Sequence, residues 1–150
     1  MPEPRVNQKT LEAIFDSIGL VDGFGKIASD VHLVDDDARD VYVQDVVDAI
    51  RDIKEKKLVQ HGVEMLSSCD SANVVSFGLD MKANHLHEGR FVPNLELEVR
   101  KSRNTYDGRK YVGTTYYCRL VYCKNTSVYR DFIFAQFDIP MENVRSVVKK

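Results

Sequence analysis

The spacing of apolar residues divides the chain into a helical first half and a second half of strands. Apolar positions recur every three or four residues over 9–18 and 38–56, which predicts two amphipathic helices. Their buried stripes are Leu11, Ile14, Phe15 and Ile18 in the first helix, and Val43, Val46, Val47, Ile50 and Ile53 in the second. Residues 58–68 fit either a short helix or a strand. Residues 1–7 are polar and contain two prolines, so we expect a flexible lead there.

Apolar and polar residues alternate in the second half, as they do along half-buried strands. The alternation predicts strands over residues 75–81, 95–100, 110–123 and 128–138. Asp107-Gly108 predicts a hairpin turn between the second and third strands, and Pro140 is suited to the first turn of a helix over 141–148. Segregated helices and strands indicate a single α+β domain over residues 1–150. We expect two N-terminal helices on one face of a four-stranded antiparallel meander, with a short C-terminal helix.

Size and composition narrow the class of protein. A chain of 150 residues is long enough for one domain, and 43% hydrophobic with 29% charged residues is ordinary for a globular protein. No stretch approaches the roughly 18 consecutive apolar residues of a membrane span, and the N-terminal residues lack the apolar core of a secretion signal. We therefore expect a cytoplasmic or otherwise intracellular protein that does not insert into a membrane. Three cysteines, an odd number, indicate reduced thiols rather than a disulfide framework.

Charge is distributed unevenly between the two halves. Residues 1–70 carry −7 and residues 71–150 carry +5, which together give the net charge of −2. Much of the acidic excess fits helix starts and solvated helix faces. The positive charge concentrates in the hairpin around Tyr106 and the predicted turn, in five residues: Arg100, Lys101, Arg103, Arg109 and Lys110.

This basic hairpin is the best candidate binding site in the sequence. A two-stranded arm fits a DNA groove, and arginine and lysine neutralise phosphates. If the adjoining strands turn a common face outward, aromatic and basic side chains extend the site as a stacking surface: Tyr117, Arg119, Arg130 and Phe132, with Phe134. The same side chains suit the centre of a protein interface. Two structural alternatives remain. The fourth strand is apolar on both sides, so it also fits a central strand that is buried on both faces. A charged hairpin tip also occurs in proteins where it serves solubility alone.

Three further patterns suggest metal binding or catalysis. For each of them, an ordinary structural role explains the residues better than a functional site does. His85 and His87 supply only two ligands, whereas a zinc site needs at least three. The acidic residues from Asp35 to Asp40 lack the spacing of a calcium loop and fit a helix start. Asp80, Glu96 and Glu98 would suit a metal-dependent phosphodiesterase, but outward carboxylates also line solvated strands.

The sequence therefore predicts a small binding protein with no catalytic residues, no metal and no cofactor. Nucleic acid or a nucleoprotein is the first expected partner. The alternative is a protein-interaction or regulatory module that works as a homodimer or with a partner chain. No residue pattern in the chain identifies a known family.

Overall fold

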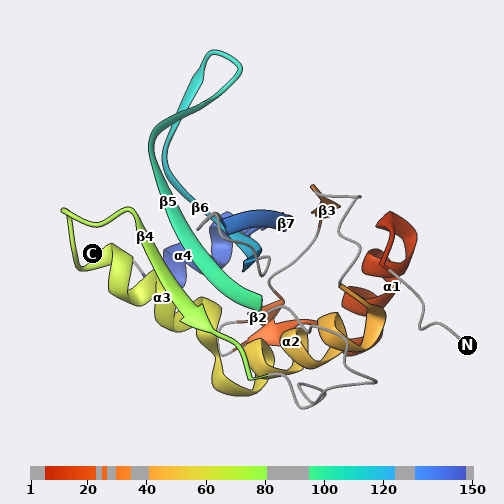
Figure 1. Cartoon of the computed structure of the whole chain (residues 1–150). Coiled ribbons are helices and arrows are strands. Elements are labelled where there is room, and N and C mark those ends of the chain that lie inside the picture. Colours follow the sequence, from red (N-terminus) through yellow and green to blue (C-terminus); the bar gives the residue numbers. More distant parts are fainter. Residues whose placement is uncertain are drawn as a thin grey trace, which may run out of the picture.

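A five-stranded antiparallel sheet lies at the centre of the computed structural model (Figure 1). The structure describes residues 6–22, 25–26, 30–34, 41–80, 95–123 and 131–147. The strand order is β3-β7-β6-β5-β4, and a separate two-stranded pair joins β1 to β2. The strands are β1 (Val21–Asp22), β2 (Gly25–Lys26), β3 (Val31–Leu33), β4 (Val74–Gly78), β5 (Leu95–Asp107), β6 (Lys110–Cys123) and β7 (Asp131–Asp138). The predicted α+β class is confirmed. Strands β4 to β7 form the expected meander, but β3 adds a fifth strand beside β7.

Within the described ranges, three helices precede the meander rather than two. They are α1 (Gln8–Ile18), α2 (Val43–Lys56) and α3 (Leu58–Ser67), and the short α4 (Met141–Val147) follows the sheet. Residues 58–67, which the sequence left as helix or strand, are therefore helical. The prediction that the second helix begins near residue 38 is wrong, because α2 begins at Val43. Its start is fixed locally, since Tyr42 donates its backbone N–H to the Asp45 carboxylate at 3.0 Å. Residues 35–40, with their aspartates, lie outside the described part of the chain.

Alternation along the strands separates a buried face from an open one. Leu95, Leu97 and Val99 on β5 are fully buried, as are Cys118 and Leu120 on β6. Helix α3 packs against this face very closely, because a Cβ on Gly62 would lie only 2.5 Å from Cγ2 of Val99. Glycine is therefore required at this helix position. The helices cover one face, and the residues between the buried ones point to the other.

The additional strand β3 is held by a side chain from α1 as well as by the sheet. Val31 is the backbone partner of Phe137 on β7. On its other side, the Gln8 amide donates to the Val31 carbonyl at 2.7 Å and accepts from the Leu33 N–H at 2.7 Å. Gln8 thus satisfies backbone groups that an edge strand would otherwise expose. Phe15 of α1 packs edge-on against Phe137 at 5.3 Å between ring centroids.

The chain after the sheet follows the predicted pattern. Pro140 precedes α4, and its carbonyl accepts hydrogen bonds from the N–H groups of Asn143 and Val144. Val144 is buried in the core cluster, which fixes α4 to the sheet. None of the helices in the described ranges has the length and apolar character that crossing a membrane would need.

Candidate functional site

The β5–β6 hairpin extends well beyond the sheet (Figure 1). Strand β4 pairs only with residues 96–100 of β5, and β7 pairs only with residues 117–123 of β6. Residues 101–116, which we call the arm, therefore continue as a two-stranded ribbon. Lys101 lies seven positions before Gly108 in the turn, so the arm spans about 23 Å at roughly 3.3 Å per residue.

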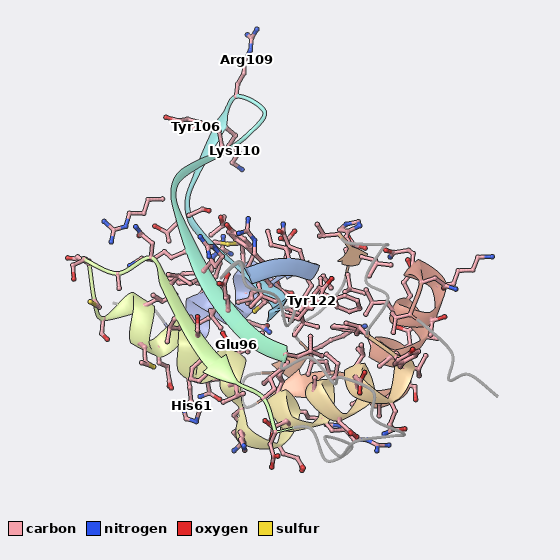
Figure 2. All side chains as sticks on the ribbon, viewed as in Figure 1. His61, Glu96, Tyr106, Arg109, Lys110 and Tyr122 are labelled. Carbon is pink, nitrogen blue, oxygen red and sulfur yellow. The ribbon has the colours of Figure 1, made fainter. Side chains whose placement is uncertain are left out.

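The tip of the arm holds exposed basic and aromatic side chains. Asp107 is the backbone partner of Lys110, so the turn residues are Gly108 and Arg109, one position later than predicted. Gly108 adopts a φ of 64°, a value that favours glycine at this position of a tight turn. Tyr106 is 62% exposed, and Arg109 and Lys110 are also exposed. Figure 2 shows all three at the far end of the hairpin, away from the body of the protein.

The base of the arm is anchored to the end of α3. Lys101 donates from Nζ to the carbonyls of Leu66 at 2.8 Å and Cys69 at 3.0 Å. The Arg103 guanidinium donates to the carbonyl of Asp70. These contacts satisfy carbonyls at and just beyond the helix end, where positive charge also offsets the helix dipole. Two of the five predicted basic residues therefore hold the arm in place.

The arm is bent as well as anchored. The pairing of β5 with β6 shifts register between Ser102 and Thr105, and again between Thr105 and Tyr106. On the opposite strand, Gly113 adopts a φ of 85°. Bulges of this kind strengthen local twist and redirect side chains. Simple alternation from the sheet therefore does not determine which way the tip residues point.

Arg100 does not belong to the arm but to the open face of the sheet. Its Nη1 lies 2.7 Å from Oε1 of Glu98. Burial works against its charge, but hydrogen bonds with Glu98 and Tyr117 outweigh that effect and raise the pKa of Arg100. Arg119 lies 5.5 Å from the centre of the Tyr117 ring and donates from Nε to Gln136 at 3.2 Å. The predicted basic residue Arg100 is thus already engaged within the sheet.

The open face as a whole is not basic. Its described charged side chains are two arginines and three carboxylates: Arg100, Arg119, Glu96, Glu98 and Asp138. The balance is −1, which gives phosphate groups no net attraction. Tyr117 and Arg119 therefore lie beside each other, as predicted, but on a surface distinct from the arm.

Phe134 does not extend this face onto β7, contrary to the expectation from simple alternation. An irregularity in the pairing of β6 with β7 between Leu120 and Val121 places Phe134 outside the regular alternation. Phe134 is 1% exposed and packs edge-on against Tyr122 at 6.3 Å. The partners of Tyr117 and Arg119 are instead Asp138 and Gln136. Phe132 is the backbone partner of Tyr122, and Arg130 lies outside the described residues.

The other candidate chemistries gain no support from the geometry. No group of three histidine, cysteine or acidic side chains is placed to hold a metal within the described ranges. Glu98 is paired with Arg100, and Glu96 points outward beside Gly78. His85 and His87 lie in the segment that is not described. Cys69 is exposed and Cys118 is buried.

Comparisons with known proteins found no family model, no curated protein and no solved structure that matches the chain.

Proposed function

We propose that the protein binds nucleic acid through the arm, with Arg109 and Lys110 at the tip contacting phosphates. The observation that carries this proposal is the projection of a narrow, basic two-stranded ribbon from the body of the protein (Figures 1 and 2). The arm contains four basic residues and one acidic residue, a charge of +3. Since the whole chain carries −2, the rest of it carries −5. Attraction to phosphate is therefore concentrated in the arm.

The shape of the arm favours duplex DNA over duplex RNA. The major groove of B-DNA is about 12 Å wide and admits a two-stranded ribbon. The major groove of A-form RNA is too deep and narrow for side chains to read. An arm of about 23 Å reaches into a groove while the acidic body remains outside it. With few phosphate contacts, we expect sequence-independent binding with a dissociation constant on the order of 10⁻⁴ to 10⁻⁶ M.

Salt dependence tests this proposal. Fluorescence anisotropy with a labelled DNA duplex should give a log–log slope of about −2 to −4, since each phosphate contact contributes roughly −0.9. The double variant Arg109→Gln/Lys110→Gln should bind more weakly and reduce the magnitude of the slope by about 2. An RNA duplex of the same length should bind more weakly than the DNA.

The matched control removes two charges elsewhere. Lys9 on α1 and Arg51 on α2 are both exposed, so Lys9→Gln/Arg51→Gln changes the net charge equally. This control should bind like the wild type. Absence of binding at low salt, or equal weakening in the two variants, would contradict the proposal.

A second candidate function is self-association through the arm. Beyond Lys101, no described strand pairs with the outer edges of the arm, and a strand edge without a neighbouring strand attracts other strands. The basic residues on the arm oppose this, because they repel each other when two arms meet. Light scattering after size exclusion distinguishes the two functions. A dimer that persists in high salt and dissociates when the arm is shortened would favour self-association, and a monomer that binds DNA would favour nucleic acid.

A further inference from the structure

A pocket of about 490 Å³ lies where the base of the arm, the end of α3 and helix α4 meet. Lys101 and Arg103 contribute to it from β5, Asp70 follows α3, and Arg145 comes from α4. The volume is within the range of about 300–1,000 Å³ that is typical of small-molecule sites. The pocket does not include the tip of the arm, so it is separate from the proposed DNA contact.

The charges around this pocket are unbalanced. Three cations face one carboxylate, which leaves a balance of +2. Lys101 and Arg103 are held in position by hydrogen bonds to the carbonyls of Leu66, Cys69 and Asp70. Each retains N–H donors, because lysine has three and arginine five. Their positions are therefore fixed before any ligand arrives, which lowers the entropic cost of binding.

Arg145 lines the pocket from α4, across from Lys101 and Arg103 on β5. It is exposed in the last turn of α4, and among the described residues it makes no hydrogen bond or ion pair. Because Val144 is buried, α4 and the backbone of Arg145 are held beside the pocket. Arg145 is thus a cation at the pocket whose hydrogen-bonding capacity the described protein does not use.

The remaining wall has apolar and aromatic character. Tyr116 and Val144 are each 4% exposed, and Met141 lies beside them in the lining. Burial raises the pKa of Tyr116, while the positive charge of Arg103 opposes that rise. The phenol therefore stays protonated at neutral pH and is available as a hydrogen-bond donor. The pocket combines a cationic end with a surface suited to a ring or an alkyl group.

We propose that this pocket binds a small organic phosphate. Arg103 and Arg145 hold its phosphate group, and Met141, Val144 and Tyr116 contact its organic part. A phosphate monoester carries close to two negative charges at neutral pH, which match the +2 balance of the lining, whereas a carboxylate carries one. Arginine also binds phosphate oxygens through paired, charge-assisted hydrogen bonds.

Phenyl phosphate is a suitable probe, because it unites a phosphate monoester with a ring. Titration calorimetry at constant ionic strength should show saturable binding of phenyl phosphate, weaker binding of inorganic phosphate and still weaker binding of benzoate. Arg145→Gln should weaken the binding of phenyl phosphate at least about tenfold, because it removes the charge-assisted hydrogen bonds from the guanidinium to the phosphate. Arg145→Lys should be intermediate, because it keeps the charge without the paired geometry.

Two controls separate a built pocket from general attraction of anions. Arg51→Gln removes the same charge from an exposed position on α2 and should bind phenyl phosphate like the wild type. Arg109→Gln/Lys110→Gln should do so as well, even though its binding of DNA is weakened. The proposal is overturned if phenyl phosphate fails to saturate at millimolar concentration, if benzoate binds equally, or if either control matches Arg145→Gln. A failure of DNA binding with intact phenyl phosphate binding would refute only the proposed function.

Discussion

The β5–β6 hairpin consists of two regions made from the same pair of strands. In the lower region, residues 95–100 and 117–123, the strands are flanked by β4 and β7 and covered by helices on one face. In the arm, residues 101–116, the two strands pair with each other, and beyond Lys101 a backbone contact with the body is the hydrogen bond that the Ile139 N–H donates to the Tyr116 carbonyl. Val121 apart, the lower region alternates buried apolar with outward polar residues, whereas the arm carries a charge of +3 and, among its described side chains, buries Tyr116 at its base. The difference separates the part of the hairpin that stabilises the fold from the part available for binding.

The two cysteines whose side chains the structure describes should differ most in their reactivity. Cys118 lies in the lower region and is fully buried, whereas Cys69 is exposed beside the anchor of the arm. Under native conditions a thiol-alkylating reagent should modify Cys69 at least about 1,000-fold faster than Cys118. Access to Cys118 requires unfolding, which costs at least about 5 kcal/mol in typical domains. Peptide mapping by mass spectrometry measures both rates, and similar rates would show that the lower region opens readily.

The reaction of Cys69 should also depend on its neighbour. A hydrogen bond from the Ser71 hydroxyl, 3.4 Å from Sγ, lowers the pKa of Cys69, and the charge of Lys101 adds to this effect. A lowered pKa extends the reactive thiolate form to lower pH. Ser71→Ala should therefore shift the pH profile of Cys69 alkylation upward and slow the reaction at neutral pH. An unchanged profile would contradict this role of Ser71.

Truncating a side chain should lower the free energy of unfolding more in the lower region than in the arm. Leu97 is fully buried, so Leu97→Ala should lower the free energy of unfolding by about 2–5 kcal/mol. Tyr106 is 62% exposed in the arm, and Tyr106→Ala should cost less than about 1 kcal/mol, the usual range for cross-strand pairs. Urea unfolding measures both values. An equal loss in the two variants would mean that the arm belongs to the cooperative core.

A smaller effect is expected where α3 contacts the lower region. Alanine normally stabilises a helix relative to glycine by about 1 kcal/mol. At Gly62, however, an added Cβ would lie 2.7 Å from Cβ of Val99, which is a stiff side chain. Gly62→Ala should therefore destabilise the fold by about 1–3 kcal/mol, as overpacking does.

Gly78 provides the matched control for this substitution. It lies on β4, and nothing lies within 4 Å of an added Cβ, so Gly78→Ala should leave stability nearly unchanged. Val99→Ala should also relieve the cost of Gly62→Ala in a double-mutant cycle of urea unfolding. A stabilising effect of Gly62→Ala would show that α3 does not pack so closely on the sheet.

Much of the fold follows from local patterns in the sequence. The apolar stripe from Leu11 to Ile18 and the alternation from Leu95 to Val99 depend on local period, and they predicted α1 and the start of β5 correctly. The position of the hairpin was also predicted from Asp107-Gly108, but the turn residues are one position later. That register depends on the pairing of Asp107 with Lys110, which the dipeptide alone does not determine.

The elements that the sequence did not predict depend on contacts between distant residues. Strand β3 has only three residues and is defined by pairing with β7 and by the Gln8 side chain. Phe134 is buried because one irregularity in pairing reverses its side of the strand, and such an irregularity has no clear local signal.

The candidate site also depends on contacts between distant residues, which local sequence patterns do not predict. Lys101 and Arg103 are bound to backbone carbonyls, and carbonyls are present at every residue, so the sequence could not separate anchors from free cations. Arg145 reaches the pocket only because α4 packs beside the base of the arm. The basic character of the hairpin was nevertheless predictable, and it identified the region that contains both proposed sites.

The separability of the arm is tested most directly by shortening the hairpin. Ser102 and Thr115 are backbone partners, so residues 103–114 can be replaced by Asn-Gly, which suits a two-residue turn. We expect a folded protein whose free energy of unfolding falls by no more than about 3 kcal/mol, the upper value of a hydrogen bond from a charged group such as the one lost with Arg103. The shortened protein should also lose the salt-dependent binding of duplex DNA. A shortened protein that fails to fold, or that binds the duplex with unchanged affinity and salt slope, would contradict this expectation.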